Sequence, residues 1–364
     1  MPSARSRSRH LASALAAALL LWSGGAARAD GTPGSTTPPP PTPPATGGAN
    51  GKELYASASH SSIEVTQVSG PTGGKRGALS SVDTTWTPPP CWYEPGFTPE
   101  QLKTFSETVG AGDVSTRIGW YGSKLWTDFF RDGKSTFNYY DTTDGTAGTV
   151  KGFDDYNLGE KGYFWRGVAT DTTDPFSWDC NRMMFWEPAG VIPKIAHAPT
   201  PRTLAEYAYD KIEVPETEVQ LKPEARSTVN LPTWVWLDKG TFQEVKVRAE
   251  LPNTGLWAET TAKPVALHLD PGTTDATTFP ASGDCTINED GSTGTPYEAS
   301  RASDPPPCGI TYLRATDGTP YQLKASVTWE ITWQGSDGTG DSLPNGTFET
   351  TQDIAVQEIQ SVNR

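Results

Sequence analysis

Aromatic rings are concentrated in one stretch of this 364-residue chain, and several carboxylates lie among them, so that the two could act together on a sugar. Paired carboxylates across a cleft hydrolyse glycosidic bonds, and Trp and Tyr rings offer large apolar faces with a polar edge. The candidate acids are Glu94, Asp128, Asp154, Asp155, Asp179 and Glu187. The candidate binding rings are Trp92, Tyr93, Trp120, Trp126, Trp165, Trp178 and Trp186. Acids beside Gly, Pro and Thr more often end turns or face water, so this set alone does not establish an enzyme.

The motifs of common enzyme classes are missing from the sequence. There is no Gly-x-Ser-x-Gly elbow of a serine hydrolase and no His-Glu-x-x-His of a zinc hydrolase. Gly133, Lys134 and Ser135 are similar to the end of a phosphate-binding loop, but Asp128 stands where its first glycine should be. We therefore expect no catalytic residues and no cofactor.

The aromatic residues have two interpretations. Twenty-two of the 101 residues from Trp86 to Trp186 are aromatic, against 10% in the whole chain. A small, glycine-rich region with few Leu, Ile and Val can fill its core with rings. The same rings could instead form an exposed platform that stacks on sugars or a partner peptide. We favour the core, and the sequence leaves open which rings are exposed.

The cysteine count predicts disulfides. The four cysteines are Cys91, Cys180, Cys285 and Cys308, an even number that is typical of an oxidising compartment. Three pairings are possible, and we favour the local one, which joins the first two and the last two. No Cys-x-x-Cys occurs, and beyond the N-terminal region the histidines are only His60, His197 and His268, so we expect no metal site.

The N-terminal residues predict export. Arg5, Arg7 and Arg9 precede an apolar stretch over residues 11–22, which is too short to span a bilayer. Ala27, Arg28 and Ala29 then match a signal-peptidase site, so residues 1–29 are expected to be a signal peptide. No later segment has the length of a membrane span. We expect a secreted protein, and the cell wall is the surface with which we expect it to associate.

The charge excludes some partners. The formal net charge is −14, and removal of residues 1–29 takes away four arginines and no acid, which leaves −18. Nucleic acid would repel such a chain, and no run of Lys or Arg offers a local basic patch. The sequence does not give the oligomeric state.

Composition divides the rest of the chain into a linker and two bodies. Residues 30–51 are rich in Pro, Gly and Thr, which predicts a disordered spacer. Residues 86–199 form the aromatic-rich body, expected to be α+β and tied by a disulfide. Its helix should begin at Thr98, with Pro99 in the first turn and Gln101 completing a capping box. A second capping box at Thr203-Leu204-Ala205-Glu206 predicts a short helix to about Tyr209, and residues 210–364 then change to strands.

The strands of the second body alternate strictly between apolar and polar residues. From Tyr321 to Gln334 every odd-numbered residue is apolar and every even-numbered one polar. Shorter alternations occur over residues 63–68, 245–251 and 265–269. Strands with one apolar and one polar, solvent-exposed face are typical of antiparallel sheets that pack on one side. We therefore predict a mainly β chain with an immunoglobulin-like sandwich.

Three segments carry a family resemblance. The residues are Leu267-His268-Leu269-Asp270-Pro271-Gly272, Cys308-Gly309-Ile310-Thr311-Tyr312 and Tyr321-Gln322-Leu323-Lys324-Ala325-Ser326-Val327-Thr328-Trp329. Together, over about residues 258–364, they resemble a degenerate PKD (polycystic-kidney-disease-type) domain. Leu267, Pro271 and Ile310 depart from that family's Trp, Asp and His. With Trp234-Val235-Trp236-Leu237 and Trp329-Glu330-Ile331-Thr332-Trp333, the chain resembles uncharacterised secreted proteins of actinobacteria.

The resemblance implies a non-catalytic sandwich that spaces or mediates contacts outside the cell. We therefore expect a cell-surface or wall-associated binding or structural protein, whose partner is wall polysaccharide or another surface protein. The alternative is a polysaccharide-active glycoside hydrolase with its site among the aromatic residues and the six acids named above.

Overall fold

The computed structural model describes residues 61–71, 75–111, 129–133, 136–140, 147–169, 179–180, 182, 184–216, 219–224, 226–237, 243–302 and 304–359. Within these ranges the fold is mainly β, as the sequence predicts, and its sheets are antiparallel apart from one parallel pairing, between residues 226–228 and 355–357. The predicted signal peptide, the predicted linker, Trp120, Trp126, Asp128 and Trp178 lie outside the described residues. None of the described helices is long and apolar enough to cross a membrane.

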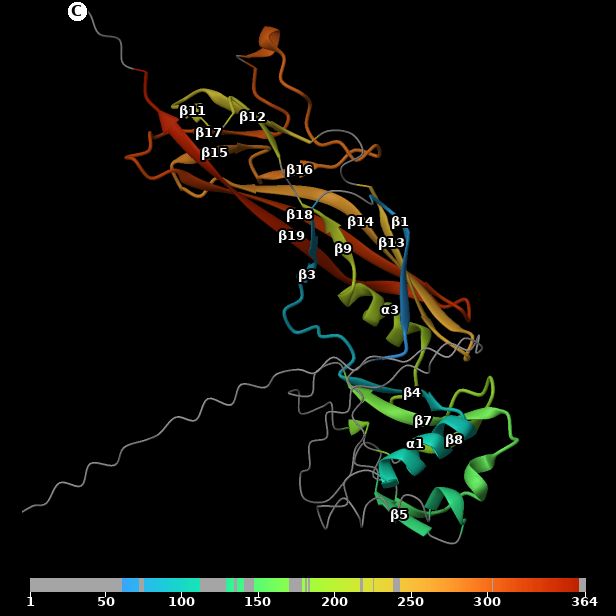
Figure 1. The fold of residues 1–364 in the computed structure, drawn as a ribbon. Helices are drawn as coiled ribbons and strands as arrows, with labels where there is room; N and C mark the ends of the chain where they lie inside the picture. The colour runs from blue at the N-terminus through green and yellow to red at the C-terminus, as the bar shows by residue number, and fades with distance from the viewer. Residues whose placement is uncertain are drawn as a thin grey trace, which may run out of the picture. The chain divides into compact units, whose positions relative to one another are not determined.

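The elements follow one another along the chain as shown in Figure 1. They are β1 (Glu64–Ser69), β2 (Arg76–Ala78), β3 (Ser80–Ser81), β4 (Cys91–Phe97), α1 (Pro99–Ala111), β5 (Thr136–Tyr140), β6 (Ala147–Lys151), η1 (Asp155–Asn157), β7 (Gly162–Ala169), β8 (Phe185–Pro188), α3 (Pro201–Asp210), β9 (Glu213–Pro215), β10 (Gln220–Lys222), β11 (Arg226–Thr228), β12 (Pro232–Trp236), β13 (Val245–Leu251), β14 (Leu256–Asp270), β15 (Ala276–Phe279), β16 (Asp284–Thr286), η3 (Ala299–Arg301), β17 (Gly309–Tyr312), β18 (Tyr321–Gly335) and β19 (Gly340–Gln357).

An eight-stranded sheet contains the longest strands, β14, β18 and β19, which run side by side (Figure 1). Its strand order is β1-β13-β14-β18-β19-β11, with β16 beside β14 and β3 beside β19. The alternation predicted for β18 is confirmed, because Leu323, Val327 and Ile331 are buried whereas Lys324 and Glu330 are exposed. The sheet therefore has one apolar and one polar face along this strand.

A β-bulge halfway along β14 changes which of its side chains, the even-numbered or the odd-numbered, are buried. Pro264 pairs with Trp329 and Ala266 with Thr328, so one extra residue lies between the two pairs. Proline has no backbone N–H to give to a sheet and is tolerated at such irregular positions. The buried side chains are therefore even-numbered before the bulge, as at Ala262, and odd-numbered after it, as at Leu267.

A four-stranded sheet, in the order β10-β12-β17-β15, shares its core with the eight-stranded sheet. Val235 and Ile310 of the small sheet belong to the same buried cluster as Leu267 and Val327 of the large one. The predicted Cys285–Cys308 disulfide is confirmed, and it ties β16 to the residue that precedes β17.

Helix α3 packs on the large sheet, although its predicted start was wrong by three residues. Thr200, not Thr203, is the N-cap, and Pro201 occupies the first turn, where proline's missing N–H and preset φ are favourable. Thr203 instead supplies the returning hydrogen bond of the capping box. Buried Ala205 then accepts a hydrogen bond from Thr260 Oγ1 of β14 at 3.0 Å.

The aromatic-rich residues form a three-stranded sheet in the order β4-β7-β8, with helix α1. The capping box of α1 is confirmed: Thr98 N–H donates to Gln101 Oε1 at 2.9 Å, and Gln101 N–H donates to Thr98 Oγ1 at 3.2 Å. The predicted Cys91–Cys180 disulfide is also confirmed. Further short antiparallel pairs join β2 to β9 and β5 to β6.

Candidate functional site

The carboxylate of Glu94, at the centre of β4, is fully buried. It accepts hydrogen bonds from the Ser61 hydroxyl at 3.0 Å, from the Ser62 backbone N–H at 3.0 Å and from Arg166 Nη2 at 2.9 Å. Arg166 lies directly opposite on β7, in register with Glu94, so the two strands place the ion pair. The indole of Trp92 lies 3.4 Å from the same carboxylate.

These contacts overturn Glu94 as a candidate catalytic acid. A carboxylate that is sealed from solvent and held by an arginine and two serines leaves no room for a sugar beside it. Glu94 instead connects the segment before β1 to β4 and β7. The sequence could not show this, because Glu94 and Arg166 are 72 residues apart.

The other candidate acids in the described residues lie in varied surroundings. Asp154 and Asp155 are exposed at η1, where Asp155 has a φ of 42° in a tight turn. Asp179 is half-buried beside the disulfide at Cys180. Burial raises the pKa of Glu187 on β8 above its usual value.

Most of the predicted binding rings that the structure describes belong to the core. Trp92, Tyr93 and Trp165 are 1%, 1% and 2% exposed, so their faces are not open to a ligand. Tyr93 meets Phe185 edge to face, with the ring centroids 5.5 Å apart. Trp186 is half-buried and packs edge to face on Phe164. For the described rings, the interpretation as a core therefore fits better than the interpretation as a platform.

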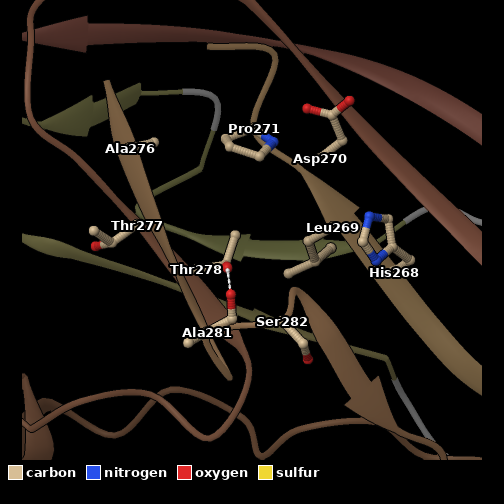
Figure 2. Close-up of a pocket in the computed structure, with 9 residues that line it drawn as sticks. All are labelled: His268, Leu269, Asp270, Pro271, Ala276, Thr277, Thr278, Ala281 and Ser282. Atoms are coloured by element: carbon tan, nitrogen blue, oxygen red, sulfur yellow. Dashed lines mark hydrogen bonds between the residues drawn. The ribbon is translucent and has the colours of Figure 1, made fainter. Parts of the chain in front are cut away.

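A pocket of about 400 Å³ lies at the end of β14, where β15 and the following loop approach it (Figure 2). Its walls combine apolar and polar side chains. The lining residues are His268, Leu269, Asp270, Pro271, Ala276, Thr277, Thr278, Ala281 and Ser282. Thr278 Oγ1 donates to the Ala281 carbonyl at 3.2 Å, which ties β15 to that loop.

A histidine–carboxylate pair borders this pocket. His268 on β14 and Asp284 on β16 are direct cross-strand neighbours, and His268 Nδ1 lies 2.8 Å from Asp284 Oδ1. Gly283 makes the approach possible, because a Cβ there would lie 2.8 Å from the Leu269 carbonyl oxygen, and its φ is +81°. Since the carboxylate engages Nδ1, Nε2 is the nitrogen that can face a ligand.

The side chains of the pocket suit a binding site better than the active site of a hydrolase. The Ser282 hydroxyl accepts a hydrogen bond from the Asp284 backbone N–H at 3.2 Å. Within the described residues no hydrogen bond joins that hydroxyl to His268, so the nucleophile–base contact of a serine hydrolase is missing. Asp270 and the hydroxyls offer acceptors and donors beside apolar Pro271, a combination that suits polar ligands with an apolar face.

Sequence reasoning counted His268 among the few histidines that argue against a metal site and placed it in the segment with the PKD-type resemblance, but it missed the pocket. The sequence held one signal: His268 and Asp270 are both even-numbered, so they lie on the solvent-exposed face of this part of β14. The partner Asp284 follows after a turn and the short β15, and nothing in the sequence gives their pairing. Comparison of the chain with protein-family models, curated proteins and solved structures finds no match.

Proposed function

We propose that this chain is a secreted, non-catalytic binding and structural protein that contacts cell-wall polysaccharide through the pocket beside His268. The C-terminal half would be an immunoglobulin- or PKD-like sandwich that presents this pocket. The aromatic-rich body would serve as a second, disulfide-tied scaffold.

Export is supported by two disulfides, since such bonds form and persist outside the cytoplasm. The sandwich is supported by the buried cluster that the eight-stranded and four-stranded sheets share. The family name rests on the sequence resemblance alone. Wall association is an expectation that rests on the predicted spacer over residues 30–51, which would hold the folded part away from a surface.

The observation that carries the ligand class is the mixture of groups around the pocket. Sugars present hydroxyls at their rims and C–H groups on their faces. Asp270 can accept from a sugar hydroxyl, and His268 Nε2 and Ser282 can donate or accept. Leu269 and Pro271 supply the apolar contact.

The test is binding of the full chain to purified wall polysaccharide, measured by calorimetry. Asp270→Asn keeps the side-chain oxygen that accepts from the Gly272 N–H but removes the charge, and we expect it to weaken Kd about tenfold. Asp341→Asn is the matched control, because Asp341 is an exposed acid of the same sheet on β19 outside the pocket lining. Equal affinity of the two variants would refute the pocket, and binding only to a surface protein would refute the polysaccharide.

The alternative, a glycoside hydrolase, has one observation in its favour. Glu187 has a raised pKa because of burial, as a general acid needs, and it lies opposite Tyr163 on the neighbouring strand. Release of reducing sugar by the full chain, abolished in Glu187→Gln, would replace the binding function with this one.

A further inference from the structure

The imidazole of His197 lies against the Cys91–Cys180 disulfide. The two sulfurs and one imidazole nitrogen all lie within 4.8 Å of one another. His197 Nε2 is buried and makes no hydrogen bond to the described residues. A buried polar atom without a hydrogen-bond partner is costly, so an unpaired nitrogen on an imidazole that lies beside two sulfurs calls for an explanation.

The backbone holds His197 firmly in this place. Its carbonyl oxygen accepts a hydrogen bond from the Tyr93 N–H at 3.1 Å, two residues after Cys91 on β4. Its φ is 57°, a left-handed conformation that a non-glycine residue adopts at a cost. Strand β4 therefore positions both Cys91 and the histidine that faces it.

We propose that the reduced chain binds zinc through Cys91, Cys180 and His197. A thiol reductant gives two electrons to the disulfide, which yields two cysteine thiols and the oxidised reductant. One Zn²⁺ then displaces both thiol protons and takes the two thiolates and the neutral imidazole as ligands, with solvent in the fourth position.

The geometry suits this ligand set. Zinc binds thiolate at about 2.3 Å and imidazole at about 2.0 Å in a tetrahedron, which places neighbouring ligand atoms roughly 3.5–3.8 Å apart. Reduction breaks the bond between the two sulfurs and lets them move apart, and the imidazole nitrogen already lies within 4.8 Å of both. The remaining adjustment is a matter of side-chain rotations at Cys91 on β4 and at Cys180 and His197, which lie in two other segments of the chain.

The second disulfide differs from the first, because the proposed zinc site needs a third ligand. Within the described residues, Cys91, Cys180 and His197 are the only such group, so Cys285 and Cys308 have no third ligand beside them. Cys91 and Cys180 can either form the disulfide or bind zinc, but not both at once. Before the disulfide forms, the metal would hold β4 against Cys180.

Cobalt(II) titration of the full chain, reduced with a phosphine under anaerobic conditions, tests the site. We expect one Co²⁺ per chain with the visible and charge-transfer absorption of a thiolate-bound tetrahedral ion. The absorption should be lost in Cys91→Ser/Cys180→Ser and kept in Cys285→Ser/Cys308→Ser. The oxidised chain should bind none.

The role of the histidine needs its own variants. His197→Ala should weaken cobalt binding at least about tenfold, whereas His268→Ala should leave it unchanged. His197→Cys should restore tight binding with a stronger thiolate band, which separates loss of a ligand from loss of folding. Unchanged affinity in His197→Ala, or failure of His197→Cys to restore a weakened site, would overturn the proposal.

Discussion

The Glu94–Arg166 pair shows how burial converts a reactive side chain into a structural one. Glu94 is 0% exposed and Arg166 16%, so both charges are largely removed from water. Such a pair adds little over an apolar pair, but one charge left behind without the other is very unfavourable. The stability of the β4–β7 contact should therefore depend on keeping both charges or neither.

Replacement of Arg166 tests that dependence. Arg166→Met leaves a buried carboxylate without its countercharge, and we expect the free energy of unfolding to fall by about 3–5 kcal/mol in urea titrations. Glu94→Gln/Arg166→Met should recover part of the loss. Arg131→Met is the matched control, because its pair with Asp132 is exposed and should be worth at most about 1 kcal/mol. Equal effects of the two Arg replacements would contradict the argument.

Among the elements, the two capping boxes show where sequence reasoning succeeds. At Thr98 the sequence gives one candidate cap, with proline next and glutamine at the third position, and the structure agrees. At α3 sequence reasoning took Thr203 as the cap because Glu206 follows three residues later, and the structure instead has Thr200 as the cap. Glu206 instead pairs with Arg202, one turn earlier, at 2.9 Å.

The cap of α3 can be tested directly. Thr200→Ala removes the acceptor for the Thr203 N–H, and we expect a loss of about 1 kcal/mol in the free energy of unfolding. Glu206→Gln should change stability by less than about 0.5 kcal/mol, since it affects only a partly exposed ion pair. The reverse order of the two effects, measured by urea unfolding, would restore the start predicted at Thr203.

Strands β18 and β14 show when the alternation of apolar and polar residues predicts a strand correctly. The parity of β18 never changes, so the sequence predicts both its length and its buried face. In β14 the bulge beside Pro264 reverses the parity, and only the part around Leu267 and Leu269 was foreseen. A local pattern predicts a strand as long as the register is regular, and a bulge is set by the partner strand.

At the scale of the whole molecule, what the sequence could not predict are the pairings between distant segments. His268 meets Asp284, and Glu94 meets Arg166, only because strands pair in a particular order. The cysteines are the exception, since their even number and their spacing already favoured the observed connectivity. The two disulfides also offer a test of how the chain's topology contributes to its stability.

The two disulfides close loops of different length, with sequence separations of 89 and 23 residues. On the chain-entropy model the longer loop stabilises by about 4.6 kcal/mol and the shorter by about 3.4 kcal/mol, because each restricts the unfolded chain. We therefore expect Cys91→Ser/Cys180→Ser to lower the free energy of unfolding by about 1 kcal/mol more than Cys285→Ser/Cys308→Ser, in urea titrations of the two variants. The opposite order would mean that the short disulfide, which joins β16 of the large sheet to the residue before β17 of the small one, stabilises the folded state directly and not through the entropy of the unfolded chain.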